Sequence, residues 1–382
     1  MDQLSLGVMG RSRKENERRL PLHPAHLGRI PEHLRGSIFL EHGYGQQFGV
    51  TDDELAGQVA GFRSHEELVA ECDIILHPKP LLRDLAEMRP GQVLWGWPHC
   101  VQDEELTQLA IDNLLTLIAF EAMNHWNRDG SFSLHVFHKN NELAGYCSVL
   151  HALQLAGCSG HFGRRLRAVV IGFGATARGA VTALTAMGVL DVDVLTHRQT
   201  AAVANPIHSA RIVHFGTESA TDKVISAITD TGPVPLAEYL AAHDLIVNCV
   251  LQNTDAPLVF LTDADLPQLR PGTLIVDVSC DQGMGFSWAR PTSFDHPTFV
   301  VGDQVTYYAV DHSPSYLWNS ATWEISEALV PFLPVVLAGP DAWDANPTIR
   351  KAIEIRDGVI QNPAILTFQS RHPIHPHWPL AT

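Results

Sequence analysis

The sequence predicts an α/β protein of two domains, each built on an open and largely parallel sheet. Short apolar segments alternate with helical ones over the first 140 residues, which is typical of such a sheet. A glycine-rich turn then opens a second alternating series near residue 167. Two helical segments follow that series, and two helices cannot form a domain alone. We therefore expect a discontinuous first domain of residues 1–140 and 320–382, a second domain of residues 145–310, and a cleft between them.

The first domain contains five short apolar segments, and each of them indicates a buried strand. The predicted strands are residues 5–9, 37–41, 74–76, 93–97 and 115–119. Helical patterns lie between them near residues 24–30, 65–70 and 103–113. Residues 142–156 then predict one long amphipathic helix, interrupted by Gly145, that leads into the second domain.

The second domain shows the same alternation over a longer stretch, which is typical of a doubly wound sheet. Its predicted strands are residues 168–171, 192–195, 211–214, 244–249, 273–278 and 298–301, and its predicted helices are residues 176–187 and 263–269. Helical patterns at residues 320–333 and 348–359 are expected to pack on the first domain. A tail at residues 369–382, rich in His and Pro, is expected to be frayed.

The glycine turn has the spacing G-x-G-x-x-A between an apolar strand and a helix. Gly172 allows the tight turn, Gly174 lets the backbone approach a pyrophosphate, and Ala177 lets helix and strand pack closely. The N–H groups around Ala175 and Thr176 would face the phosphates at the positive end of the helix dipole. The turn therefore predicts a dinucleotide site in a Rossmann-like domain.

The end of the next strand indicates which dinucleotide is bound. NAD sites place an acidic residue there for the ribose hydroxyls, and residues 195–199 contain none. Arg198 can pair with a 2′-phosphate, while Thr196 and His197 can donate hydrogen bonds to it. We therefore predict NADP(H) as the cofactor.

Composition excludes several classes of protein. Hydrophobic residues make up 45% of the chain and charged residues 18%, which excludes wholesale disorder. The formal net charge of −16 argues against nucleic acid as a partner. The six cysteines form no C-x-x-C pair, and the 21 histidines show no spacing typical of a metal site, so we expect reduced thiols and no metal. Neither a signal peptide nor a transmembrane segment is predicted, so we expect a cytoplasmic protein without membrane partners.

Polar residues follow several predicted strands at the edge where ligands bind in open α/β sheets. Lys79 and His99 come directly after consecutive strands of the first domain. Asp281 lies just beyond a core strand of the second domain, and Arg19 belongs to a polar segment near the N-terminus. Arginine offers a bidentate fork to a carboxylate, and histidine titrates near neutral pH. These residue types suit a 2-oxo acid substrate and a proton transfer.

Together these segments resemble the alanine dehydrogenase and pyridine nucleotide transhydrogenase superfamily. The pattern Arg-x-x-x-x-Pro, the strand-end lysine and histidine, the mid-chain glycine turn and the motif V-D-x-x-x-D-Q-G recur in that order over nearly the whole chain. Within the superfamily, residues 95–102, 277–286 and 308–319 look closest to the N(5)-(carboxyethyl)ornithine synthases.

The resemblance implies reductive condensation of pyruvate with the side-chain amine of ornithine, using NADPH, and a homo-oligomer. Carried over by position, Arg19 and Lys79 would bind the carboxylate and carbonyl of the 2-oxo acid. His99 would be the general acid and base, and Asp281 would orient the reacting groups or stabilise cationic intermediates. Alanine dehydrogenases usually carry an acidic residue after the lysine, where this chain has Pro80. Alternatives are an alanine or saccharopine dehydrogenase-type enzyme and a non-catalytic NADP sensor.

Further residues are candidates for reading the amino acid substrate. They follow a strand of the first domain or lie in the segment that returns to it: Glu121, Asn124, Trp126, Asp311, His312 and Tyr316. Loop polarity explains these residues equally well, so both interpretations remain open.

Overall fold

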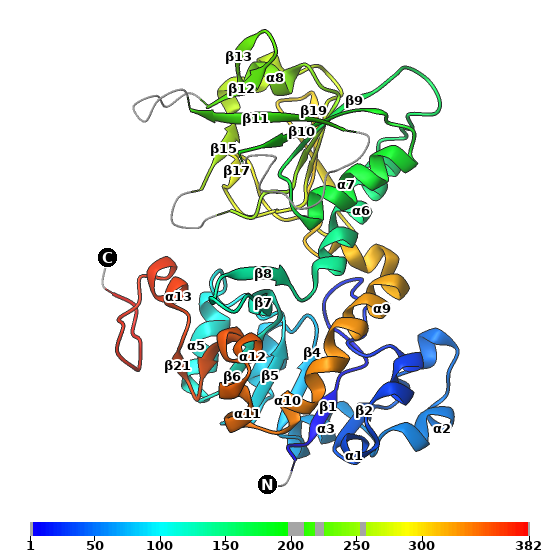
Figure 1. Cartoon of the computed structure of the whole chain (residues 1–382), viewed down its shortest axis with the longest axis vertical. Coiled ribbons are helices and arrows are strands. Elements are labelled where there is room, and N and C mark those ends of the chain that lie inside the picture. Colours follow the sequence, from blue (N-terminus) through cyan, green and yellow to red (C-terminus); the bar gives the residue numbers. More distant parts are fainter. Residues whose placement is uncertain (1–2, 198–209, 218–224, 253–256, 381–382) are drawn as a thin grey trace. The chain divides into compact units, whose positions relative to one another are not determined.

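The structure, a computed structural model, describes residues 3–197, 210–217, 225–252 and 257–380. The chain divides into two compact units. Unit 1 comprises Met1–His138 and Trp318–Thr382, and unit 2 comprises Lys139–Leu317. Both units are α/β structures with largely parallel sheets, which confirms the predicted fold class. Figure 1 shows the C-terminal segments, coloured orange to red, beside the N-terminal ones within unit 1.

Unit 1 contains a sheet in which parallel strands run in the order β3-β2-β1-β4-β5-β6. The strands are β1 (Leu6–Val8), β2 (Ile38–Glu41), β3 (Gly61–Arg63), β4 (Ile74–His77), β5 (Val93–Gly96) and β6 (Thr116–Ala119). Strand β20 (Ile353–Arg356) pairs antiparallel with β6 and forms a hairpin with β21 (Val359–Ile360). The order reverses between β1 and β4, which is the switch point where such sheets bind ligands.

Helices and short turns cover this sheet, and some of them begin with clear capping residues. Ser64 and Thr51 form capping boxes, and Asp103 accepts from the N–H of Leu106. The elements are η1 (Pro24–Arg29), α1 (Glu32–Arg35), α2 (Asp52–Leu55), α3 (His65–Glu71), α4 (Leu82–Ala86), α5 (Glu104–Asp112), η4 (Phe120–Ala122), β7 (Asn124–Trp126), β8 (Phe132–His135), α9 (Trp318–Leu329), α10 (Leu333–Leu337), α11 (Pro340–Ala345), α12 (Pro347–Ala352) and α13 (Pro363–Phe368).

Unit 2 repeats the same strand order in its described parallel strands, β11-β10-β9-β14-β16-β19. They are β9 (Arg167–Ile171), β10 (Asp191–Thr196), β11 (Arg211–Thr217), β14 (Leu245–Asn248), β16 (Leu274–Asp277) and β19 (Val305–Tyr308). Antiparallel strands β12 (Ile225–Thr229), β13 (Gly232–Pro235) and β18 (Thr298–Val301) extend its edges, and β15 (Val259–Leu261) pairs separately with β17 (Gly285–Phe286). This is the strand order of a dinucleotide-binding domain.

Two long helices of unit 2 approach each other through glycines. Helix α6 (His138–Leu155) carries Gly145, where an added Cβ would lie 1.9 Å from Thr176 O. Helix α7 (Ala175–Ala186) carries Gly179, where a Cβ would lie 1.7 Å from Glu142 O. Gly145, which interrupts the expected apolar face, is therefore a packing residue. The remaining helical elements are α8 (Leu236–Ala241), η6 (Asp263–Gln268) and η7 (Ser313–Leu317).

The structure corrects three predicted elements. Residues 348–359 are not one helix, because α12 ends at Ala352 and the alternating Ile-Glu-Ile-Arg that follows forms β20. Residues 298–301 do form a strand, but β18 is antiparallel, and β19 supplies the parallel strand beside β16. The tail is not frayed up to residue 380, since Gln369 donates to Cys100 O at 2.6 Å and Arg371 is 5% exposed.

Unit 1 and unit 2 each have apolar layers on both sides of their sheets. In unit 1 the two layers lie around Trp95 and around Leu117, which belong to adjacent strands. Burial on both faces is the reason why these strands read as continuous apolar runs in the sequence. Across the described residues, no helix has the length and apolar character needed to span a membrane.

Candidate functional site

The carboxyl edge of the unit 1 sheet brings together three residues that the sequence singled out. Lys79 follows β4, His99 follows β5, and Glu121 lies in η4 directly after β6. Lys79 Nζ lies 2.8 Å from His99 Nε2. Glu121 Oε1 accepts a hydrogen bond from the backbone N–H of His99 at 2.7 Å and lies 3.8 Å from His99 Nδ1. Adjacent parallel strands thus gather a cation, an imidazole and a carboxyl group.

The close approach of β4 and β5 depends on Gly96. A Cβ at Gly96 would lie 2.0 Å from His77 O, a distance that no side chain tolerates. Trp97 N–H then donates to Pro78 O at 3.0 Å, which ties together the two loops that carry the reactive residues. His99 itself adopts a positive φ of 52°, a strained conformation of the kind often found at functional sites.

The contact between Lys79 and His99 constrains the proton on the imidazole ring. A protonated lysine has three donors and no acceptor. When Lys79 is charged, His99 Nε2 must therefore accept, and the ring proton of neutral His99 sits on Nδ1. The side chain of His99 is 44% exposed, so a substrate can reach the ring.

Glu121 is an acid with unusual surroundings. Its side chain is 26% exposed, yet its Oε2 is buried and has no hydrogen-bond partner in the described residues. Burial, reinforced by the charge of Glu354, raises the pKa of Glu121 to about 8, and the N–H of His99 and the charge of Lys79 oppose this shift. Glu121 therefore releases its proton at a higher pH than an ordinary glutamate. Sequence reasoning named Glu121 as a substrate residue but did not find Glu354.

Arg19 lies in a buried ion pair. Its guanidinium binds both carboxylate oxygens of Glu17, with Nε to Oε1 at 2.8 Å and NH2 to Oε2 at 2.5 Å. The side chains of Arg19 and Glu17 are only 4% and 1% exposed. The guanidinium also stacks over the ring of Trp97 at 5.3 Å, two residues before His99. Glu17 therefore orients Arg19, and a substrate carboxylate would have to share its donors.

The glycine turn of unit 2 has the geometry that a dinucleotide requires. Gly172 adopts a φ of 118°, and a Cβ there would lie 3.0 Å from Cys249 O. Gly174 precedes the first turn of α7, which contains Ala175, Thr176 and the buried Ala177. The N-cap residue Gly174 has no side chain with which to cap this helix, so its N-terminal N–H groups suit a pyrophosphate. The backbone at this turn thus fits the implied cofactor.

The residues expected to select NADP(H) are placed only in part. Thr196 ends β10 and is buried, and His197 follows it on the surface. Arg198 lies outside the described residues. Asp193, the buried carboxylate of β10, binds Arg211, His243 and Tyr239. It is therefore engaged within the domain.

Asp281 stands on a tightly organised turn after β16. Asp277 at the end of β16 is fully buried and accepts from Tyr307 Oη at 2.5 Å, Asn248 Nδ2 at 2.9 Å and the N–H of Cys280 at 3.1 Å. Cys280 has a positive φ of 47°, and Asp281 follows it. Burial raises the pKa of Asp281, and burial raises that of Asp277 to about 6. The motif V-D-x-x-x-D-Q-G thus contains a structural acid and a more exposed one.

The remaining candidates make contacts within their own units. In unit 1, the ring of Trp126 packs against Lys351 Nζ at 3.5 Å, and Asn124 donates to Ala122 O. In unit 2, His312 is buried and pairs with Asp311 at 2.7 Å, while the Tyr316 hydroxyl binds Gln154. These contacts suit structural roles, and the interpretation of these residues as substrate readers stays a prediction.

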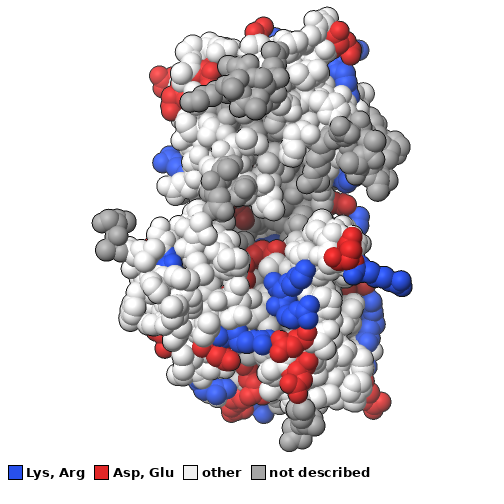
Figure 2. All heavy atoms as spheres, turned by 60° about the vertical axis from the view of Figure 1, so that its left-hand side comes forward, with Lys and Arg blue, Asp and Glu red and all other residues white. Residues whose placement is uncertain are grey.

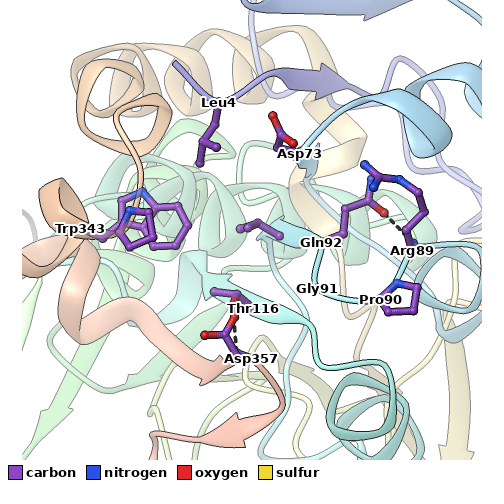
Figure 3. Close-up of a pocket in the computed structure, with 11 residues that line it drawn as sticks. Leu4, Asp73, Arg89, Pro90, Gly91, Gln92, Thr116, Trp343 and Asp357 are labelled. Atoms are coloured by element: carbon purple, nitrogen blue, oxygen red, sulfur yellow. Dashed lines mark hydrogen bonds between the residues drawn. The ribbon is translucent and has the colours of Figure 1, made fainter. Parts of the chain in front are cut away.

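A separate pocket of about 240 Å³ opens at the amino end of the unit 1 strands (Figure 3). Its polar side chains bind the protein itself: Gln92 donates to Val69 O and Cys72 O, and Asp73 accepts from Ser5. Because Lys79 and His99 lie at the opposite ends of these strands, the pocket is not part of their site.

Charged side chains of both signs lie on the surface of unit 1. Figure 2 shows acidic and basic side chains intermingled on one face of this unit rather than a continuous basic surface. Among the residues that the structure describes, no group of three or more His, Cys, Asp or Glu side chains could hold a metal ion.

Comparison with known families gives this geometry its context. The N-terminal domain of the alanine dehydrogenase/PNT family matches residues 8–144, and the C-terminal domain of the same family matches residues 153–363. The chain belongs to this family. Its sequence-based assignment to the superfamily is therefore confirmed.

Individual relatives carry more than one name. Alanine dehydrogenase from Mycobacterium tuberculosis H37Rv is 24% identical over 376 residues, covering 93% of this chain and 94% of the relative. N(5)-(carboxyethyl)ornithine synthase from Clostridium botulinum is 24% identical over 329 residues, covering 81% and 90%. A solved L-alanine dehydrogenase superposes with a TM-score of 0.71 at 21% identity, covering 96% of this chain and 99% of that one. The transhydrogenase from Sinorhizobium meliloti gives 0.68 at 18%, covering 94% and 99%. The structural likenesses show the fold.

Proposed function

We propose that this chain is an NADPH-dependent oxidoreductase that condenses pyruvate, or a similar 2-oxo acid, with the side-chain amine of ornithine or a related diamino acid. Family membership supports the coarser part of this proposal, an NAD(P)-dependent oxidoreductase acting on amino acids. The observation that carries the proposal is the 2.8 Å contact between Lys79 Nζ and His99 Nε2. At such a site, the cation can polarise a carbonyl group while the adjacent imidazole transfers a proton.

In the proposed reaction, Arg19 and Lys79 bind the carboxylate and the carbonyl oxygen of the oxo acid. An alkyl ammonium has a pKa of about 10.4, so only about one molecule in 2,500 is neutral at pH 7. His99 therefore takes the proton of the attacking amine and returns a proton when the carbinolamine loses water. Asp281 stabilises the cationic imine. The cofactor, when bound at Gly172 and Gly174, supplies the hydride that reduces this imine.

Alanine dehydrogenase activity is the second candidate. It is favoured by the name of several full-length relatives, among them the enzyme from Mycobacterium tuberculosis. The same residues would then act with ammonia in place of the side-chain amine. Pro80 after the lysine, and the absence of an acidic residue in residues 195–199, distinguish this sequence from the usual alanine dehydrogenase pattern.

One assay separates these possibilities. NADPH oxidation is followed with pyruvate plus ornithine, lysine or ammonia, and then with 2-oxoglutarate in place of pyruvate. The proposal expects turnover with pyruvate and a diamino acid. Turnover with ammonia alone would instead identify an amino acid dehydrogenase, and turnover with 2-oxoglutarate and lysine a saccharopine-type enzyme. NADPH binding without any turnover would indicate a sensor.

Two substitutions test the assigned roles. His99→Ala should lower kcat by about 10²–10⁴-fold, whereas the exposed His33→Ala in the same unit should leave it unchanged. An unaltered kcat in His99→Ala would remove this residue from the mechanism. Arg198→Ala should weaken the binding of NADPH much more than that of NADH, and equal losses would contradict a phosphate contact.

A further inference from the structure

Glu354 is a buried acid at an irregular point of the first sheet. Ile353 pairs with Ile118 and Ile355 pairs with Leu117, so β20 advances two residues where β6 advances one. Glu354 is therefore the extra residue of a β-bulge, an irregularity that re-aims a side chain and often lies beside active sites. The residue is only 3% exposed. Burial of a carboxyl group is costly, so its presence at this position calls for a physical explanation.

The carboxyl group of Glu354 has an incomplete set of partners. Its Oε1 accepts from Asn362 Nδ2 at 3.0 Å, while its Oε2 is buried and lacks a hydrogen-bond partner in the described chain. Glu121 Oε2 is also buried and lacks a hydrogen-bond partner among the described residues. Each carboxyl group thus has a donor on its Oε1 only, and two such buried acids would carry a large desolvation penalty if both were ionised. Burial therefore favours a proton on one of the two acids.

Glu121 connects these acids to His99, because it lies beside both the main chain and the ring of that residue. Glu121 Oε1 accepts the N–H of His99 at 2.7 Å and lies 3.8 Å from its Nδ1, so the ring is exposed to any charge on Glu121. The fully buried thiol of Cys100, the next residue, interacts with both Glu354 and Glu121. The other titratable groups around the pair are Lys79, His99, Asp103 and His135.

We propose that Glu354 is a positioning residue: its buried carboxyl group, placed by the β-bulge, acts on Glu121 and thereby sets the charge that Glu121 presents to the ring of His99. The raised pKa of Glu121, to which the charge of Glu354 contributes, has the direction that this arrangement requires. Only an effect of Glu354 on kcat rests on the proposed function, because His99 would lose or gain its proton in the same way without substrate.

The test is a titration of His99 in the full-length protein labelled with ¹³C at histidine Cε1. The signal of His99 is assigned by its absence from His99→Gln. Glu354→Gln keeps the volume and an oxygen for Asn362 but removes one of the two causes that raise the pKa of Glu121, so Glu121 ionises at lower pH and the pKa of His99 rises by about one unit. Asp344→Asn, which removes an exposed carboxylate paired with Arg356 of β20, should leave the pKa of His99 unchanged.

A second variant distinguishes action through Glu121 from a structural disturbance. In a Glu121→Gln background, Glu354→Gln should produce no further shift. An unshifted His99 in folded Glu354→Gln would overturn the proposal, and so would a shift that persists without Glu121.

If Glu354→Gln does not fold, Glu121→Gln still tests the premise that Glu121 carries a proton. The neutral amide of Glu121→Gln should leave the pKa of His99 at its wild-type value, whereas a fall of about one unit would show that Glu121 is ionised in the wild-type protein and overturn the proposal. The titration uses no substrate, so failure of the proposed reaction and failure of this inference are separate outcomes.

Discussion

At the scale of single residues, the buried pair of Glu17 and Arg19 makes a simple alanine substitution ambiguous. Arg19→Ala would leave the Glu17 carboxylate, 1% exposed, without its guanidinium. We expect a loss of about 3–5 kcal/mol in the free energy of unfolding, because an uncompensated buried charge is costly. The double variant Glu17→Ala/Arg19→Ala should lose less than the sum of the two single variants, as chemical denaturation would measure. Strict additivity would argue that the two side chains are not coupled.

A second prediction at this scale concerns Asp277 and pH. Burial raises the pKa of Asp277 from an ordinary value of 3.8 to about 6, so folding favours its protonated form. Its contribution to stability is therefore fully present below pH 3.8 and is lost as the pH rises through 6. Relative to Asp277→Asn, the wild-type protein should gain about 1 kcal/mol of stability between pH 7 and pH 5.

Amide hydrogen exchange of the β16 segment, corrected for intrinsic rates, measures this difference within unit 2 itself. A difference between wild type and Asp277→Asn that stays constant over this pH range would show that Asp277 keeps an ordinary pKa in the folded protein.

Sequence reasoning reached some of these residues and missed others for physical reasons. Lys79 and His99 could be found because each directly follows an apolar strand, and parallel strands end at one edge. Glu354 could not be found in this way. It lies far along the chain in a segment that predicts a helix, and only the pairing of β20 with β6, the strand before Glu121, brings the two acids close enough to interact electrostatically.

At the scale of elements, Gly96 controls how closely β4 and β5 approach. In Gly96→Ala, the added Cβ would meet His77 O at 2.0 Å, so the strand ends must separate. We expect a loss of roughly 1–3 kcal/mol in stability and a further loss of kcat, since Lys79 and His99 would move apart. Thermal unfolding and NADPH oxidation provide the two measurements.

Gly36→Ala is the matched control, because a Cβ at Gly36 meets no atom within 4 Å and its φ of −66° suits alanine. This variant should retain both stability and activity. Equal effects of the two substitutions would mean that the spacing of β4 and β5 is not what limits either property.

The elements themselves were predictable where patterns were long and local. The central strands of both sheets follow from apolar runs bounded by turns, and α7 follows from the glycine turn before it. Strand β20 escaped prediction because its four residues continue directly from α12. Its partner β6 is more than 200 residues earlier in the chain, so only tertiary pairing distinguishes the strand from a longer helix.

At the scale of the whole molecule, the six cysteines differ in how far the fold exposes them to solvent. The structure shows no disulfide among them: Cys72, Cys100 and Cys147 are buried, Cys249 and Cys280 are partly buried, and Cys158 is exposed. Thiolate is the reactive form, and burial raises the pKa of Cys72 to about 11 and that of Cys100 well above its ordinary value. The native protein should therefore react with a maleimide first at Cys158, as intact-mass and peptide analysis would show.

Denaturation supplies the internal reference for this labelling, because all six thiols should then react. Cys158→Ser should abolish the fast phase in the native protein and leave the slower ones in place. Fast labelling at Cys100 would be the most informative contrary result. The thiol is fully buried and interacts with both Glu121 and Glu354, so its modification in the native state would mean that the surroundings of these acids open to solvent. The buried acid pair would then be hydrated, and it would lose the low dielectric that keeps its proton in place.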